Sequence, residues 1–128
     1  MAILGQLSED KIRRYLQDWF AQEFSPKKLK LQTGTGIEEH EFDAVSEDGK
    51  VVAEVKALTH PEYPNEMQLA REDVALLHFA NTERKLLFLT DPIFYIVFCR
   101  THRDVMLEWK KMGIQVVSPF ELNKYLEA

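Results

Sequence analysis

The stretch that decides the fold is residues 42–57, which read Phe42-Asp43-Ala44-Val45-Ser46-Glu47-Asp48-Gly49-Lys50-Val51-Val52-Ala53-Glu54-Val55-Lys56-Ala57. Two β-rich runs, 38–46 and 50–58, flank Glu47-Asp48-Gly49, and an Asp-Gly pair between such runs is a strong β-hairpin signal. Alternation along the second run places Glu54 and Lys56 on one face. If the strands pair about the turn, Asp43 comes beside that triplet. The stretch therefore predicts two carboxylates and an ammonium on one face of a sheet.

Helices and further strands are expected on both sides of this hairpin. An apolar stripe with helical spacing runs from Ile12 to Phe24; Ser8 would cap that helix and Pro26 would end it. The other expected elements are a strand over 28–32, a helix over 66–80, a buried strand over 86–90, a helix over 93–112, a strand over 114–117 and a helix over 118–126. The apolar run 93–99 is ambiguous and could form a strand instead. The order α-β-β-β-α-β-α-β-α predicts an α/β protein whose mixed central sheet is flanked by helices.

The composition is that of a soluble globular protein. The chain has 128 residues, of which 45% are hydrophobic and 29% charged, so we expect one domain over residues 1–128. The single cysteine, Cys99, excludes an intramolecular disulfide and a cysteine-based zinc site. No apolar run approaches the ~18 residues that a bilayer span needs, and no signal peptide is visible. A cytoplasmic protein without a membrane partner is therefore expected.

The net charge of −5 at first argues against a nucleic-acid partner. However, residues 38–48 hold six carboxylates and no lysine or arginine. Removing those six from the 21 acidic residues leaves 15 against 16 basic ones. The acidity is thus concentrated around one hairpin, where a divalent cation could neutralise part of it. Net charge is weak evidence against DNA, and without metal we expect poor DNA binding.

The charged group on the hairpin has a direct chemical use. Two carboxylates together with water oxygens suit a hard divalent cation such as Mg²⁺. A bound cation acidifies water and stabilises charge on a phosphoryl oxygen. A neighbouring lysine can orient the attacking water or neutralise charge that develops in the transition state. These are the parts that phosphodiester hydrolysis needs.

At these residues the chain resembles the core of the PD-(D/E)xK, or restriction-endonuclease-like, nucleases. Asp43 matches the first acidic residue of the family motif, and Glu54-Val55-Lys56 matches its (D/E)xK triplet. The residue before Asp43 is Phe42, where the motif has proline. The resemblance covers roughly residues 8–91. It implies an α-β-β-β-α-β core, here followed by a C-terminal helix-strand-helix.

The resemblance also implies a set of site residues. Asp43, Glu54 and Lys56 would be catalytic. A Mg²⁺ (or Mn²⁺) ion would be held by Asp43, Glu54 and the backbone carbonyl of Val55. Lys56 would position water or stabilise the transition state.

Further candidates depend on the family pattern or on strand alternation. Many members carry a metal-binding acid on the first helix; Glu9 matches its usual place near the helix start, and Glu23 is the rival. Gln68 matches a glutamine that some members carry on the helix after the triplet. Alternation places His40 on the face opposite Asp43, so we expect a structural or surface role for it.

The leading hypothesis is a metal-dependent endonuclease that hydrolyses phosphodiester bonds in DNA, with RNA as an alternative partner. Small members of the family usually act as homodimers or as one component of a larger assembly, because one site cuts one strand. The alternative is a non-catalytic domain of the same fold that binds nucleic acid or mediates oligomerisation. Titration with Mg²⁺ or Mn²⁺ discriminates between the two.

Overall fold

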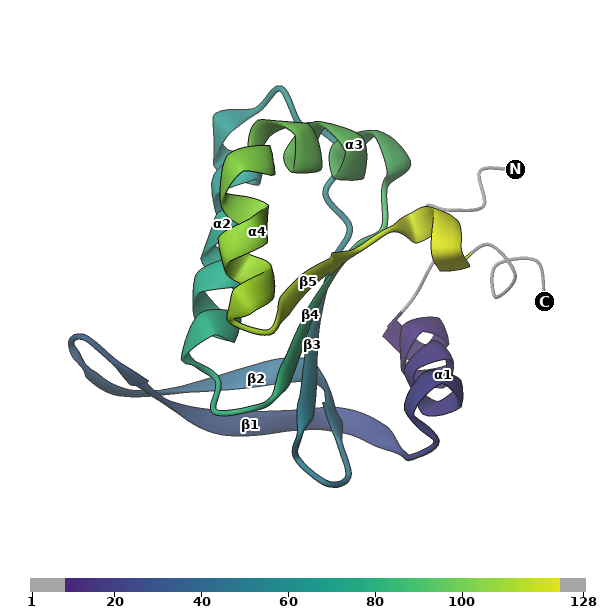
Figure 1. The fold of residues 1–128 in the computed structure, drawn as a ribbon, viewed down its shortest axis with the longest axis vertical. Helices are drawn as coiled ribbons and strands as arrows, with labels where there is room; N and C mark the ends of the chain where they lie inside the picture. Colours follow the sequence, from purple (N-terminus) through teal and green to yellow (C-terminus); the bar gives the residue numbers. More distant parts are fainter. Residues whose placement is uncertain (1–8, 123–128) are drawn as a thin grey trace.

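The structure, a computed structural model, describes residues 9–122. Within these residues one five-stranded sheet runs in the order β1-β2-β3-β4-β5 (Figure 1). Its strands are β1 (Phe24–Thr33), β2 (Gly36–Ser46), β3 (Val51–Lys56), β4 (Arg84–Leu89) and β5 (Ile114–Val117). The first three strands pair antiparallel, and β3, β4 and β5 pair parallel. The expected α/β class with a mixed sheet is confirmed.

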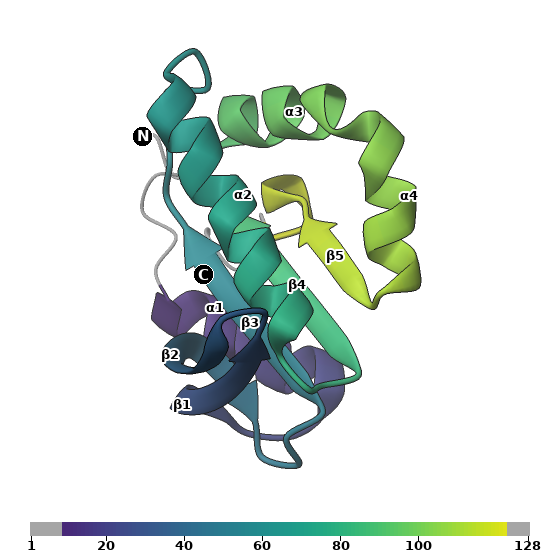
Figure 2. The ribbon, with the colours of Figure 1, turned by 90° about the vertical axis from the view of Figure 1, so that its left-hand side faces the viewer.

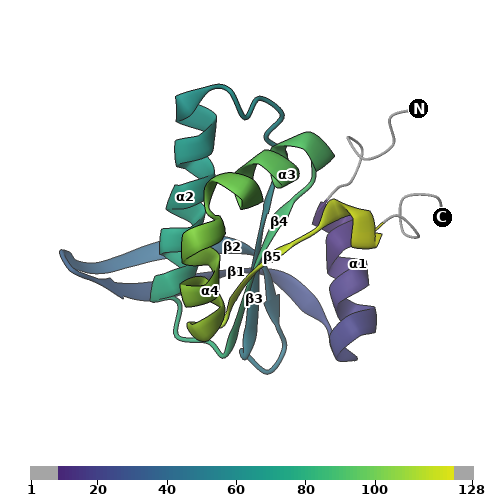
Figure 3. The ribbon, with the colours of Figure 1, turned by 45° about the horizontal axis from the view of Figure 1, so that its top comes forward.

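Helices cover both faces of this sheet. They are α1 (Glu9–Phe20), α2 (Pro64–Phe79), α3 (Pro92–Thr101), α4 (Arg103–Lys111) and the short 3-10 helix η2 (Pro119–Leu122). Figures 1 and 3 show α1 on one side of the sheet and α2 and α4 on the other. Up to β4 the observed order is the expected α-β-β-β-α-β. Among the described helices, none has the length and apolar character needed to cross a bilayer.

Two buried clusters, one on each face, hold the layers together. The cluster on the α2 face joins β2, β3 and β4 to α2 and α3; it includes Phe42, Val45, Val52, Met67, Ala70, Val74, Leu77, Leu87, Leu89, Phe94 and Phe98. The cluster on the α1 face includes Ile12, Leu16, Phe24, Ala44, Val51, Ala53, Leu86 and Phe88. The expected buried strand is thus β4, which packs on both faces and lies between two parallel neighbours.

A β-bulge interrupts the pairing of β1 with β2. One residue of β1, Pro26, lies opposite two residues of β2, Asp43 and Ala44. Proline lacks the N–H that a ladder needs, and it is tolerated here because β1 is an edge strand. The extra residue breaks strict alternation, so that Phe42 and Val45, three positions apart, both pack on the α2 face.

The helix expected over 12–24 is too long, because α1 ends at Phe20. Ala21 follows with a left-handed φ of +57°, a conformation that commonly terminates a helix. Phe24 instead begins β1 and packs into the cluster on the α1 face. The apolar stripe continued past the helix end because a helix residue and a strand residue can bury against the same core. Pro26 therefore lies within a strand.

The helix expected over 93–112 is two helices, α3 and α4, that meet at His102 and run in different directions (Figure 2). The His102 Nδ1 donates to the carbonyl of Phe98 at 2.8 Å, and the ring packs against both Phe98 and Trp109. The buried imidazole of His102 thus lies where α3 ends and α4 begins. Of the helix expected over 118–126, the structure describes η2; residues 123–126 and the expected cap Ser8 lie outside the described residues.

Candidate active site

The charged pair Glu54 and Lys56 points from β3 towards α2. Val52, two positions earlier on the same strand, packs in the cluster on the α2 face, and Ala53 packs on the opposite face. Alternation therefore sends Glu54 and Lys56 to the α2 face as well. Glu54 is 4% exposed, whereas the side chain of Lys56 is 36% exposed. The expectation that both residues share a face is confirmed.

Asp43 reaches this pair because β2 and β3 stop forming a ladder beside it. The two strands pair over Ala44 and Val45 on β2, directly before the hairpin turn. Beyond that point side chains take the backbone donors: Asp43 Oδ2 accepts from the Val55 N–H at 2.7 Å, and Glu54 Oε1 accepts from the Asp43 N–H at 3.1 Å. Each of the two carboxylates therefore accepts a hydrogen bond from the backbone of the other strand, which places Asp43 beside the triplet as the hairpin predicted.

His40 also belongs to the charged group that Asp43, Glu54 and Lys56 form, so the prediction that it lies on the opposite face is wrong. Its Nε2 lies 2.9 Å from Glu54 Oε2. The bulge at Asp43 and Ala44 is the reason, because it shifts the alternation between His40 and the hairpin turn. His40 follows Phe42 onto the α2 face, where its ring packs edge-on against the Phe42 ring. Both oxygens of Glu54 thus have a hydrogen-bond partner.

A third buried carboxylate, Asp73, approaches the cluster from α2. Asp73 is 4% exposed, and its Oδ2 lies 3.7 Å from Lys56 Nζ. The sequence interpretation missed this residue, although a signal was present. Asp73 falls three positions after Ala70 and four before Leu77, within the buried apolar stripe of α2.

Burial and mutual repulsion set the electrostatics of the cluster. Burial raises the pKa of Glu54 to about 7, with the charges of Asp43 and Asp73 adding to the rise and the hydrogen bond from His40 opposing it. Burial also raises the pKa of Asp73 to about 6, and the Lys56 ammonium opposes that rise. The cluster thus holds more negative charge than its own cations neutralise.

Glu9 lies one guanidinium group away from Asp43. Arg13 Nη1 donates to the backbone carbonyl of Asp43 at 3.0 Å, and the same nitrogen is 3.6 Å from Glu9 Oε1. Glu23 follows the end of α1, is exposed, and accepts through its carbonyl from the Glu47 N–H beside the hairpin turn. Of the two rival acids, the structure brings Glu9 to the Asp43 end of the site. Arg13, which the sequence pattern did not single out, makes that link.

Gln68 and Val55 differ in how close they lie to the cluster. Gln68 is exposed on α2 and hydrogen-bonds with Glu72 and Arg71 on the same helix. Val55 lies in the triplet and donates its N–H to Asp43. The role of its carbonyl as a metal ligand stays a prediction.

The donor set fits a hard divalent cation. Glu54 accepts from the Asp43 N–H, and Asp43 accepts from the N–H of Val55, the residue after Glu54. Burial, together with the charge of Asp43, raises the pKa of Glu54, so an added positive charge beside these carboxylates would be favourable. Within residues 9–122, no group of three or more His, Cys, Asp or Glu side chains is arranged to hold a metal ion by itself. Mg²⁺ usually keeps several waters and needs only one or two carboxylates, so this finding is compatible with the set.

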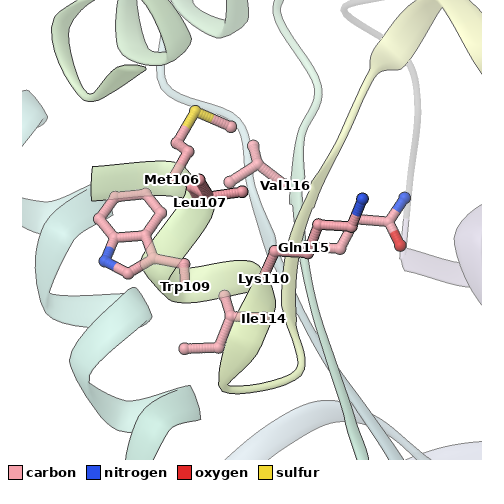
Figure 4. Close-up of a pocket in the computed structure, with 7 residues that line it drawn as sticks. All are labelled: Met106, Leu107, Trp109, Lys110, Ile114, Gln115 and Val116. Atoms are coloured by element: carbon pink, nitrogen blue, oxygen red, sulfur yellow. The ribbon is translucent and has the colours of Figure 1, made fainter. Parts of the chain in front are cut away.

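A groove lined mainly by apolar side chains lies elsewhere among the described residues. It has a volume of about 470 Å³ and lies between α4 and β5, which β4 separates from β3 (Figure 4). Its lining residues are Met106, Leu107, Trp109, Lys110, Ile114, Gln115 and Val116. This lining offers no carboxylate, hydroxyl or thiol, whereas Asp43, Glu54, Lys56, Asp73 and His40 bring three carboxylates, an ammonium and an imidazole together.

Comparisons with known proteins do not extend this picture. A scan against protein-family models, a search of curated proteins and a search of solved structures each found no match for this chain.

Proposed function

We propose that this chain is a Mg²⁺- or Mn²⁺-dependent nuclease of the restriction-endonuclease-like kind, which hydrolyses phosphodiester bonds in DNA. The observation that carries the proposal is the meeting of Asp43, Glu54 and Lys56 at the point where β2 leaves β3. The peptide N–H of Asp43 bonds Glu54, and the peptide N–H of Val55 bonds Asp43. Residues from two strands are thus held in one arrangement whose electrostatics favour a cation.

Each residue has a distinct task in this proposal. Asp43 and Glu54 would hold the cation, with the Val55 carbonyl as a further ligand and Glu9 as a ligand from α1. When bound, the cation would supply an acidified water and would stabilise charge on a phosphoryl oxygen. Lys56 would orient the attacking water or donate to the phosphate as negative charge develops.

DNA is the proposed polymer, with RNA as a second substrate to be tested. The acidic stretch 38–48 includes Asp43, so a bound cation would offset repulsion where the phosphate must approach. We also propose that the chain works as a homodimer or within a larger assembly, because one site cuts one strand. The oligomeric state follows from light scattering of the purified chain.

The test is a cleavage assay on single-stranded, duplex, flap and branched DNA with Mg²⁺, Mn²⁺ or EDTA. We expect cation-dependent cleavage that Asp43→Ala and Lys56→Ala each lower by about 10²-fold or more. Asp104→Asn and Lys50→Ala are matched controls, because both residues are exposed and lie outside the cluster. A cleavage rate within about tenfold of wild type in Asp43→Ala or in Lys56→Ala would overturn the proposal. Absence of both cleavage and cation binding would favour a non-catalytic module that binds nucleic acid or mediates oligomerisation.

A further inference from the structure

Asp73 is a charged residue at a buried position of α2 where the neighbouring buried side chains are apolar. It lies in α2 among Ala70, Val74 and Leu77, which pack in the cluster on the α2 face. Asp73 itself is 4% exposed. A carboxylate in such a place loses its hydration, and the fold recovers that loss only through partners.

The partners of Asp73 are few. Its Oδ2 is buried and has no hydrogen-bond partner within residues 9–122. At 3.7 Å the Lys56 ammonium is near enough for an ion pair but too far for a hydrogen bond. Lys56 and His40 face Asp73 with favourable charge, whereas Asp43 and Glu54 face it with unfavourable charge. An unsatisfied buried oxygen aimed at one lysine is a poor structural device, because an apolar residue of similar size would pack better.

We infer that Asp73 is a positioning residue that holds the Lys56 ammonium at the end of β3, where it serves the site formed by Asp43 and Glu54. The inference rests on the proposed function. It goes beyond that function by assigning a role to a residue of α2 that lies outside the sequence motif.

The physical basis is the freedom of the lysine side chain. The ammonium of Lys56 sits on a flexible stem that is 36% exposed, so alone it would sample several rotamers. A fixed carboxylate on the facing helix restricts that sampling. Because the two partners come from β3 and α2, the ion pair also ties the layer that carries the motif to the layer that covers it. Positioning of this kind lowers the barrier of a reaction by removing misplaced arrangements.

The test uses Asp73→Asn and Asp73→Leu in the full chain, with Glu72→Gln as the matched control. Glu72 is the preceding residue on α2, but it is exposed and bonds Gln68. We expect both Asp73 variants to lower kcat for DNA cleavage about tenfold or more, while KM and the Mn²⁺ dissociation constant change less than about twofold. Neither variant should lower the urea midpoint of unfolding, since each removes a buried charge and the Lys56 ammonium left behind is on a side chain exposed enough to be hydrated.

A second measurement isolates the pair from activity. In ¹³C-dimethylated protein, the signal of Lys56, assigned with Lys56→Ala, should differ from those of exposed lysines and should move to their position in Asp73→Asn. In the cleavage assay, Asp73→Asn should cause no further loss once Lys56→Ala is present, because the two residues act as one unit.

The outcomes separate the inference from the proposed function. An unchanged kcat in both Asp73 variants overturns the inference and leaves the nuclease intact. A fall in kcat with a matching fall in the urea midpoint assigns Asp73 to structure and also overturns it. If the wild-type chain does not cleave, the proposed function fails and the positioning role fails with it. The lysine signal then still shows whether the ion pair forms.

Discussion

β3 and β4 are neighbouring strands of equal length, but they use the same face of the sheet in opposite ways. In their shared register Glu54 lies beside Leu87 and Lys56 beside Leu89. Glu54, Leu87 and Leu89 are all at most 4% exposed. The two leucines pack into the cluster on the α2 face, whereas Glu54 has a pKa raised to about 7 by burial.

The comparison shows that a buried position on this face of the sheet does not need a charged side chain. β4 shows that leucines at the paired positions satisfy the packing, and they do so without a desolvation penalty. The charges on β3 therefore cost stability that the fold could have kept. The chemical task that we propose for Glu54 and Lys56 would account for that cost, as in the trade-off between stability and activity at active sites.

The largest effect is expected when a charged group on β3, or Asp43 beside it, is removed. We expect Lys56→Ala and Asp43→Ala to lower DNA cleavage by about 10²–10³-fold, the loss that follows removal of one group stabilising the transition state. Initial rates at saturating Mn²⁺ measure this. Circular dichroism should show both variants folded, and a residual rate within tenfold of wild type would contradict the assignment.

The matching change on β4 should act on stability instead. Leu87→Ala leaves a cavity in the cluster on the α2 face, and we expect it to lower the free energy of unfolding by about 2–5 kcal/mol. Urea denaturation measures the loss. The folded fraction should keep a near-normal kcat once the rate is corrected for unfolded protein. A Leu87→Ala variant that is fully stable but inactive would reverse the roles we assign to the two strands.

The pH dependence of stability should separate the two strands next. The folded state raises the pKa of Glu54 from 4.5 to about 7, so it binds this proton more tightly than the unfolded chain does. The stabilisation is complete below pH 4.5 and is lost as the pH rises through about 7. For the metal-free protein we expect a loss of roughly 2–3 kcal/mol from this group between pH 5 and pH 8.

Urea denaturation across that pH range tests the expectation with two variants. Glu54→Gln should flatten the curve, although Asp73, whose pKa is raised to about 6, leaves a smaller slope of the same sign. Leu87→Val should shift the curve without changing its shape. A Glu54→Gln curve parallel to wild type would show that Glu54 is not a strained carboxylate.

The smallest expected effect concerns His40. His40→Ala removes the donor to Glu54 Oε2, and at pH 8 we expect a loss of about 1 kcal/mol in the free energy of unfolding. In the Glu54→Gln background the same substitution should cost less, because no carboxylate is left without its partner. Equal costs in both backgrounds would show that the His40–Glu54 contact does not contribute to stability.

The hairpin and its charged residues could be predicted from the sequence because local signals define both. The Asp-Gly turn brings Asp43 opposite Glu54, and period-two alternation orients Glu54 and Lys56 within β3. The structure confirms where these three residues lie and the order of elements up to β4, while their roles stay predictions.

The missed features depend on contacts that local patterns do not encode. His40 joins the site through a bulge that the register with Pro26 creates, and the sequence of β2 alone does not reveal it. Asp73 reaches Lys56 across two layers, so its position in the stripe of α2 was visible but its partner was not. Phe24 packs with the core from a strand as readily as from a helix, which hid the end of α1.

The central claim is that Asp43 and Glu54 hold a divalent cation, and calorimetric titration of the purified chain with Mn²⁺ at pH 7.5 tests it most directly. We expect saturable Mn²⁺ binding in the wild type, and loss of that binding in Asp43→Asn and in Glu54→Gln. Glu38→Gln, an exposed acid of β2, should bind as the wild type does. No binding to the wild type, or unchanged binding in both site variants, would contradict the claim.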